Sequence, residues 1–410
     1  MQSERLLTYQ ETANDVVVFL IKYYYNIVMA IIWEWMRQIW IPTSSIRLAE
    51  AERRVLSIIK FPFDQQQVPI GDGLTINTIH TYNAEAKRSD RKRSPLVLLH
   101  GFGAGVGFWL LNLDALAAQH EHVYAIDLLG CGRSSRPRFG AKTTQEAEQF
   151  FIDALERWRI QFNLDKMILL GHSFGAYIGS CYAMAFPARV SHLILASPVG
   201  VPKEPVQVEP PNRQRTSIGW RLVRDFVLFL WNRGYTPLSV VRLLGPVGPR
   251  PVTAYVTRRF LIGPAVEEET SPATAEAGLE TSAALADQID RGRLKLPKRD
   301  VAQYLYHLCA QPGSGEFALP RVLKSNVFAY DPLEDRLGNS EIPRVTFFYG
   351  DHDWMDTEAG RRTVKSLNER QDAAESARLI VIPRAGHQMM IDNPDGFNQA
   401  VEQALEDHQE

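Results

Sequence analysis

The stretch LLGHSFGAYIGS at residues 169–180 decides the fold. It contains Gly171-His172-Ser173-Phe174-Gly175, a G-x-S-x-G pattern, between the apolar run MILL and a helix-like run. On a sharp strand-to-helix turn, such a serine projects its hydroxyl above a sheet, and glycines leave room where side chains would clash. The following helix offers backbone N–H groups to a developing oxyanion. The stretch predicts a nucleophilic Ser173; the alternative is a serine in an ordinary turn.

Short apolar runs ending in turn residues recur on both sides of this stretch. They are PLVLLHG, HVYAIDLLG, KMILLGHS, VSHLILASP, RVTFFYGD and ARLIVIPRAGH. Continuous apolar strands are typical of a parallel sheet covered on both faces. Helix-like segments such as TQEAEQFFIDALERWRIQF lie between most of them. This alternation predicts a doubly wound, mostly parallel α/β sheet.

The alternation is interrupted once and divides the chain. Residues 61–198 form the first part of the predicted core, and residues 343–410 form the second. Residues 199–342 are helix-like, apolar and rich in arginine, so we expect a cap inserted over the carboxyl edge of the sheet. Residues 1–60 precede the core and include a short helical stretch that begins after Pro42.

Residues 16–42, VVVFLIKYYYNIVMAIIWEWMRQIWIP, are long enough to span a bilayer. A charge facing lipid at the centre of a bilayer costs roughly 2.5–3.5 kcal/mol. At about 100° per residue, the polar side chains share one side of a helix; they are Lys22, Asn26, Glu34, Arg37 and Gln38. With the tryptophans, this favours a helix lying on a membrane surface. A helix packed on the protein's own core and a true span are the alternatives.

The composition excludes some classes of partner. A formal net charge of -2 argues against nucleic acid as a bulk electrostatic partner. With 45% hydrophobic and 22% charged residues, the chain can bury a sizeable core. The three cysteines, Cys131, Cys181 and Cys309, are far apart and show no metal-ligand spacing. We expect reduced thiols, no metal and no cofactor; the oligomeric state is not determined by the sequence.

A serine nucleophile needs a base that is held by an acid. In a sheet with this turn, the chain order is serine, acid, histidine. His387, in IVIPRAGHQMMIDNP, is the last histidine that follows a predicted strand. FFYGDHDWMD also follows a strand, and Asp353 is the expected acid, with Asp356 as the second choice. An unused aspartate has an ordinary role in capping the next helix.

The loop LLHGFGAGVGFW at residues 98–109 supplies a second donor for an oxyanion. Its glycines let the backbone approach a ligand closely. We expect the N–H groups of Phe102 and Phe174 to form the anion site, although the loop is also compatible with simple flexibility. Asp127, at the end of a predicted strand, is expected to order this loop rather than to react.

These segments together resemble a group of α/β-hydrolase-domain lipid enzymes. The group includes lysophospholipid and N-acylphosphatidylethanolamine lipases, a lipid-droplet lipase coactivator and a fungal cardiolipin-specific deacylase. The likeness covers residues 95–401 and includes the cap segments LLGPVGP and YLYHLCAQPGSGEFA, with YGDHDWMD closest to the fungal and plant members. The resemblance implies the α/β-hydrolase fold, phospholipid substrates and a membrane-associated intracellular location. It favours cardiolipin and mitochondria, with lipid droplets or endoplasmic reticulum as alternatives.

The same resemblance adds two further interpretations. His387 and Asp392 form an H-x4-D motif, which in this group implies lysophosphatidic acid acyltransferase activity. The ordinary role for Asp392 is to cap the helix that starts near Asn393-Pro394. The coactivator member lacks its nucleophile, so the presence of Ser173 favours an active enzyme over a non-catalytic membrane scaffold.

The main prediction is therefore a serine lipid acylhydrolase. His387 removes the Ser173 proton, Asp353 orients the imidazole, and water releases the acyl chain. Cap aromatic residues are expected either to line an acyl groove, to meet the membrane or to pack in the cap core; they are Trp220, Phe226, Phe229 and Trp231. Three cap arginines are candidates for phosphate contacts, namely Arg221, Arg224 and Arg242.

Overall fold

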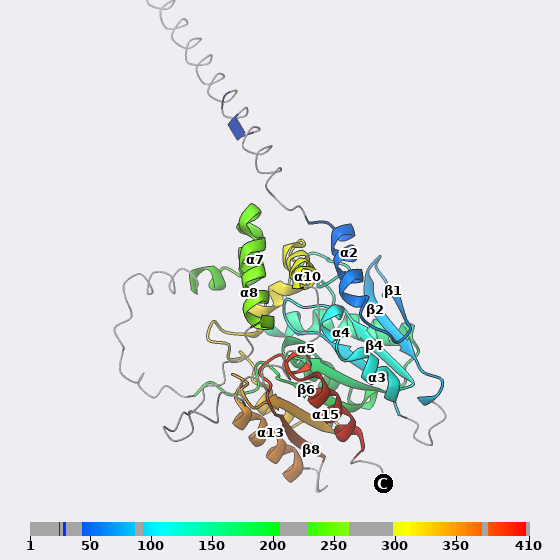
Figure 1. Ribbon diagram of the computed structural model, residues 1–410. Helices are drawn as coiled ribbons and strands as arrows, with labels where there is room; N and C mark the ends of the chain where they lie inside the picture. The colour runs from blue at the N-terminus through cyan, green and yellow to red at the C-terminus, as the bar shows by residue number, and fades with distance from the viewer. Residues whose placement is uncertain are drawn as a thin grey trace, which may run out of the picture.

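A computed structural model describes residues 24, 28–29, 43–86, 93–205, 228–261, 298–370 and 376–406. Its centre is an eight-stranded sheet with the order β1-β2-β4-β3-β5-β6-β7-β8 (Figure 1). The strands are β1 Phe63–Pro69, β2 Thr75–Tyr82, β3 Leu96–Leu99, β4 His122–Ile126, β5 Met167–His172, β6 Val190–Ala196, β7 Val345–Gly350 and β8 Ala377–Ile382.

The strand directions confirm the predicted, mostly parallel sheet. β1 pairs antiparallel with β2, and β2 pairs antiparallel with β4. All strands from β4 to β8 then run parallel to their neighbours. The first two strands form a hairpin, whose turn places Gly71, Asp72 and Gly73 at positive φ. Glycine adopts this left-handed backbone without a steric penalty, which explains the GDG sequence.

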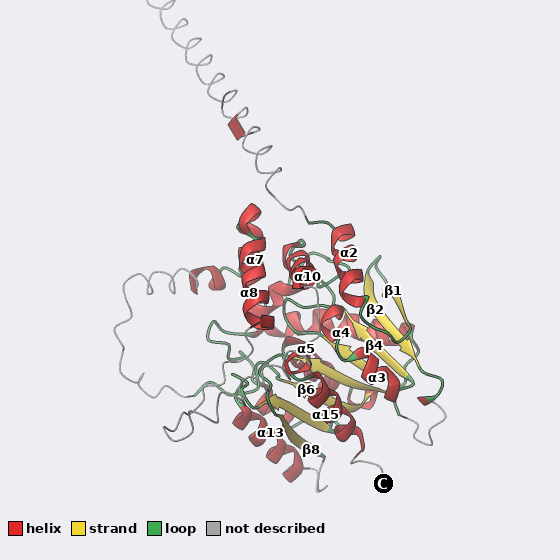
Figure 2. Cartoon of the chain, viewed as in Figure 1, coloured by secondary structure: helices red, strands yellow, loops and turns green. Residues whose placement is uncertain are grey.

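Helices cover both faces of the sheet, as Figure 2 shows. Side chains of α4 (Thr144–Gln161), α5 (Phe174–Ala185) and α13 (Thr357–Arg370) share one buried cluster with Val97 and Leu99. Side chains of α3 (Leu113–Gln119) and α15 (Pro394–Glu406) share the opposite cluster with Leu96 and Leu98. Since successive residues of a strand face opposite sides, one apolar run fills two cores.

The chain between β6 and β7 leaves the sheet and forms further helices. They are α7 Pro237–Leu243, η4 Gly245–Val247, α8 Pro249–Leu261, α10 Lys298–Ala310, η5 Gly315–Ala318, α11 Leu319–Val322 and α12 Leu333–Leu337. The helix α2, Ser45–Leu56, packs with α8 and α10 in a third cluster that includes Leu48, Val55, Val256 and Tyr304. Figure 1 shows α2, α8 and α10 on the same side of the molecule. The N-terminal helix and the insertion are therefore one packed unit.

The expected membrane-surface segment 16–42 lies outside the described residues, apart from Tyr24, Val28 and Met29, which are exposed and helical. Among the helices that the structure describes, none has the length and apolar character needed to cross a membrane. The predicted boundaries at residues 60, 198 and 342 remain predictions.

Candidate active site

Ser173 stands at the sharp turn between β5 and α5. Its φ of 54° and ψ of -114° are unusual for a residue with a side chain, so the turn stores backbone strain. A Cβ on Gly171 would lie 2.5 Å from the Gly175 carbonyl oxygen, and one on Gly175 would lie 2.4 Å from the His100 carbonyl oxygen. Both glycines are therefore required by backbone crowding, as the G-x-S-x-G pattern predicts.

Three side chains meet at the carboxyl ends of the parallel strands, where α/β sheets bind ligands. Ser173 follows β5, Asp353 follows β7 and His387 follows β8. The Nε2 atom of His387 lies 3.0 Å from Ser173 Oγ, within hydrogen-bonding distance. The Nδ1 atom of His387 lies 3.5 Å from Asp353 Oδ1, which is longer than a direct hydrogen bond. The structure thus brings the serine, histidine and aspartate together in the expected order.

The Asp353 side chain is fully buried. Its carboxylate accepts hydrogen bonds from the Ser197 hydroxyl and from the Met355 N–H at 3.1 Å. Burial acts to raise the pKa of Asp353, but His387 and these donors outweigh it and hold the pKa below its ordinary value. Asp353 is therefore ionised at neutral pH and can stabilise a protonated imidazole.

The neighbouring acids have other partners. Asp356, the second choice for the acid, accepts the Ala359 N–H at 3.1 Å and caps the start of α13. Asp351 accepts the N–H groups of Arg384 and Ala385 at 2.8 and 3.0 Å, and so fixes the loop that leads to His387. Neither carboxylate contacts His387, which leaves Asp353 as the acidic partner of His387 among the described residues.

The predicted role of Asp392 as a helix cap is wrong. Asp392 is the last residue of α14 (Met389–Asp392), and its carboxylate accepts the Gly386 N–H at 2.9 Å. The cap of α15 is Asn393, whose side-chain oxygen accepts the Gly396 N–H at 3.0 Å. Both residue types are good caps, so the sequence alone could not separate two neighbours. Asp392 instead holds the backbone next to His387.

His172 is a site residue that sequence reasoning missed. Its buried ring donates from Nε2 to the His387 carbonyl oxygen at 2.8 Å. Burial and the nearby His387 lower the pKa of His172 to about 3, so the ring is neutral and remains a single-proton donor. The variable position of G-x-S-x-G gives no signal for this role, because its partner is a backbone atom 215 residues away.

The two predicted oxyanion donors lie in one place. Phe102 and Phe174 line the same small cavity of about 20 Å³, which has room for about one water molecule. A Cβ on Gly101 would lie 2.8 Å from His172 Nδ1 and 3.2 Å from Ser173 Cβ, so the loop passes directly beside Ser173. The close approach needs glycine at this position.

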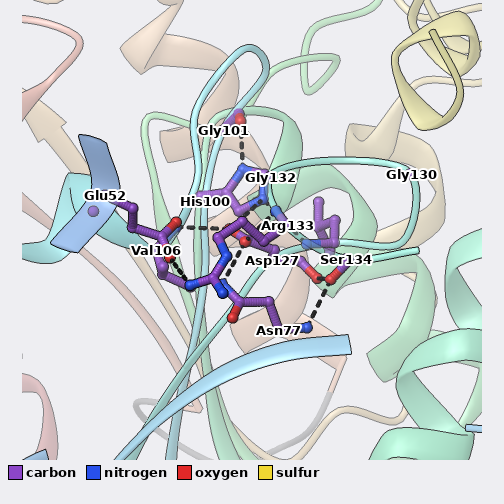
Figure 3. Close-up of polar contacts among 12 residues, drawn as sticks. Glu52, Asn77, His100, Gly101, Val106, Asp127, Gly130, Gly132, Arg133 and Ser134 are labelled. Atoms are coloured by element: carbon purple, nitrogen blue, oxygen red, sulfur yellow. Dashed lines mark hydrogen bonds and ion pairs between the residues drawn. The ribbon is translucent and has the colours of Figure 1, made fainter. Parts of the chain in front are cut away.

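Asp127 orders the loop at residues 98–109, which we name the oxyanion loop after its predicted role, and this agrees with the structural role expected for Asp127 (Figure 3). Its buried carboxylate accepts the Val106 N–H at 2.8 Å, the Arg133 N–H at 2.8 Å and the Asn77 side-chain amide at 2.7 Å. A Cβ on Gly132 would lie only 2.1 Å from this carboxyl group. The GCGRSS sequence therefore wraps tightly around Asp127.

A second buried carboxylate, Glu52 from α2, stands beside this cluster (Figure 3). It accepts hydrogen bonds from Gln65 at 2.6 Å, Arg133 at 3.0 Å and the Tyr304 hydroxyl at 3.2 Å. The Tyr304 oxygen in turn accepts the Gly107 N–H at 3.1 Å. Burial and the charge of Asp127 raise the pKa of Glu52 to about 7. The N-terminal helix, the insertion and the oxyanion loop thus share one polar network.

The predicted lipid-contacting residues of the cap have mixed outcomes. Arg242 is not available for phosphate, because its guanidinium pairs with Glu316 and donates to the carbonyl oxygens of Cys309 and Gln311. Phe229 is 51% exposed and lies under Arg233, whereas Trp231 is half-buried against the core. The remaining candidates lie outside the described residues; they are Trp220, Arg221, Arg224 and Phe226.

Known proteins share the fold of this chain and part of its sequence. A family model described as "alpha/beta hydrolase fold" matches residues 94–394. A 1-acylglycerol-3-phosphate O-acyltransferase of Arabidopsis thaliana is 37% identical over 372 residues, covering 88% of this chain and 81% of the relative. A (lyso)-N-acylphosphatidylethanolamine lipase of Homo sapiens is 32% identical over 366 residues, covering 88% of this chain and 92% of the relative. The carboxylesterase CesB of Bacillus subtilis matches with a TM-score of 0.55 and 16% identity, over 89% of this chain and 99% of its own.

Proposed function

Because the chain belongs to the α/β-hydrolase family, we propose that it is a serine-dependent hydrolase of acyl ester bonds in phospholipids. The observation that carries the proposal is the 3.0 Å separation between Ser173 Oγ and His387 Nε2 at a strained turn. This is the arrangement of an activated nucleophile. The family resemblance that the motifs predicted is confirmed by relatives at 32–37% identity.

The reaction follows from the positions of these groups. His387 Nε2 takes the Ser173 proton while Oγ bonds to the ester carbonyl carbon, and the carbonyl oxygen becomes an oxyanion beside Phe102 and Phe174. His387 then returns the proton to the departing alcohol as the ester C–O bond breaks. Water, deprotonated by the same imidazole, releases the fatty acid and regenerates Ser173. Asp353 stabilises the charged imidazole, and its 3.5 Å distance can shorten when that charge forms.

The substrate class rests on the relatives and on the N-terminal segment. The names of the plant and human relatives refer to a lysophosphatidate acyltransferase and a lipase of N-acylated phosphatidylethanolamine. Residues 16–42 carry the apolar and aromatic pattern of a membrane-surface helix. We therefore assign a phospholipid at a membrane surface as the substrate. Cardiolipin and a mitochondrial membrane remain the favoured finer assignment, on the resemblance to fungal members.

Acyl transfer to lysophosphatidate is the second candidate, favoured by the name of the plant relative. Here a lysolipid hydroxyl would replace water as the acceptor, and His387 would deprotonate it in the same way. Substituting Asp392 does not separate the two activities, because its bond to Gly386 N–H supports the His387 loop in either case. The acceptor must be identified directly from the products.

The test uses purified full-length protein and the Ser173→Ala variant with a panel of phospholipids, with and without lysophosphatidate and an acyl donor. Mass spectrometry then identifies the lipids that lose or gain chains. We expect wild type to release fatty acid and Ser173→Ala to lose about 10³-fold or more of that rate. Ser191→Ala is a matched control, since within the described residues its hydroxyl makes one hydrogen bond, to the Met167 carbonyl oxygen at 3.2 Å. Unchanged hydrolysis by Ser173→Ala would contradict the proposal.

A further inference from the structure

A second hollow, larger than the oxyanion cavity, lies between the loop at residues 138–142 and the insertion. Its volume is about 740 Å³, which is in the range of small-molecule binding sites. Besides the loop, it is lined by residues 233–235, by Ser239, Arg242 and Leu243 of α7, and by Phe317 and Arg321. Five of the described lining residues are cationic and none is acidic; the cations are Arg138, Lys142, Arg233, Arg242 and Arg321.

Three of these five cations, Arg138, Arg233 and Arg321, have no carboxylate partner among the described residues. Arg242 is neutralised by Glu316, and Lys142 lies beside Glu146, whose carboxylate accepts the Lys142 N–H at 2.7 Å. Arg233 stacks over the Phe229 ring at 4.9 Å, which orients its guanidinium without removing its charge. Arg321 is half-buried, and Arg138 and Lys142 are exposed. Cations gathered around one hollow repel each other unless an anion joins them, so the hollow favours an anionic ligand.

The hollow adjoins the oxyanion cavity. Arg136 and Arg138 flank Pro137 in the sequence. Arg136 lines the small cavity, and Arg138 lines the hollow. Leu238 and Glu316 line the small cavity, while the next residues in sequence, Ser239 and Phe317, line the hollow. The two spaces are therefore neighbours separated by these segments, and the Arg242–Glu316 pair joins a residue that lines the hollow to one that lines the small cavity. A ligand held in the hollow is thus near the groups proposed to hold the oxyanion.

We propose that this hollow binds the phosphate-bearing headgroup of the lipid whose ester is presented to Ser173, with Arg233 and Arg321 as the main contacts. The assignment rests on the proposed function and specifies its substrate class as an anionic phospholipid. A guanidinium group can donate two parallel hydrogen bonds to two oxygens of one phosphate. Arg138 and Lys142, at the rim of the hollow, add long-range attraction for the negatively charged headgroup. A soluble phosphate compound presents the same chemistry, so the test separates the two sources.

The binding arm of the experiment needs no catalysis. The Ser173→Ala protein is sedimented with phosphatidylcholine vesicles that contain or lack phosphatidic acid. Adding Arg233→Gln and Arg321→Gln is expected to weaken binding to phosphatidic acid vesicles about tenfold, as two charge-assisted contacts are lost. Arg361→Gln with Arg370→Gln removes the same charge from α13 and is the control for net charge. Equal weakening by both pairs, or by neither, overturns the assignment.

The second arm measures selectivity in the active enzyme. The rate on phosphatidic acid is divided by the rate on phosphatidylcholine, with a short-chain ester used to count active enzyme. We expect Arg233→Gln with Arg321→Gln to lower this ratio about tenfold, and a ratio unchanged from wild type overturns the assignment. If no phospholipid is hydrolysed but the binding difference persists, the hydrolase proposal fails and the headgroup site stands. If inorganic phosphate or glycerol 3-phosphate displaces vesicles at matched phosphate concentration, the site takes a soluble phosphate and the lipid assignment is overturned.

Discussion

Replacing Glu52 with glutamine removes one of two carboxylates that are buried side by side near the oxyanion loop. The Glu52 side chain is 0% exposed and accepts hydrogen bonds from Gln65, Arg133 and Tyr304. Glutamine has the same shape and one remaining acceptor oxygen, so it resembles the protonated acid. The change removes the titration of this group while the size of the side chain is kept.

The magnitude follows from the pKa of Glu52, which burial and Asp127 raise from 4.5 to about 7. Between these two pH values, the folded protein holds a proton that the unfolded chain has released. Proton binding by the folded state means that the free energy of unfolding falls as pH rises. At about 1.4 kcal/mol for each pH unit, the loss approaches about 3 kcal/mol and is complete above pH 7. Glu52→Gln lacks this loss, so its advantage over wild type grows across the same interval.

The assay is urea unfolding of wild type and Glu52→Gln between about pH 5 and pH 8. His172 and His307 have lowered pKa values and produce the opposite slope, but they are present in both proteins and their contributions cancel in the difference. The charge of Glu52 acts on His100, whose pKa burial lowers to about 4, so a change in that pKa affects stability near pH 4, below the range of the assay. The exposed Glu358, which pairs with Arg361, provides the control substitution Glu358→Gln. Parallel stability curves for wild type and Glu52→Gln would refute the account of a buried, protonated Glu52.

Two further predictions concern the turn at Ser173. Gly175→Ala places a Cβ 2.4 Å from the His100 carbonyl oxygen, so we expect the free energy of unfolding, measured with urea, to fall by about 1–3 kcal/mol. The control Gly140→Ala has nothing within 4 Å of its Cβ and should leave the free energy of unfolding nearly unchanged. Equal urea midpoints for the two variants would contradict the crowding at Gly175. His172→Leu removes the donor to the His387 carbonyl oxygen, and we expect kcat to fall about tenfold or more with little change in KM. His172→Gln, which retains an N–H donor, should recover part of the rate, and failure of both variants to differ from wild type would exclude a positioning role.

Much of the sheet was predictable because parallel strands are buried on both faces. RVTFFYGD became β7, Val345–Gly350, and KMILLGHS became β5, Met167–His172. Each strand is largely apolar along its length and buried throughout, a pattern typical of strands covered on both faces. The glycines around Ser173 were equally informative, since close backbone contacts at Gly171 and Gly175 leave no alternative residue.

The polar contacts were less predictable because they join residues far apart in the chain. Glu52 lies in a charged stretch that indicates an exposed helix face, yet Arg133 and Tyr304 satisfy it in the interior. Arg242 was expected to meet phosphate, but Glu316 on another segment neutralises it. The sequence gives the type of side chain, whereas the partner that determines its role depends on how the insertion packs.

The contacts of Glu52 also bear on what the N-terminal region does. Residues 16–42 are expected to meet a membrane, while α2 immediately after them reaches the oxyanion loop through Tyr304 and Gly107. Removing residues 1–42 therefore removes the segment expected to meet a membrane and keeps the Glu52 network. Removing residues 1–60 also takes away Glu52, and it leaves Arg133 without this carboxylate and Tyr304 without an acceptor. Because these two truncations change different parts of the molecule, only the shorter one separates the expected membrane contact from the integrity of the oxyanion loop.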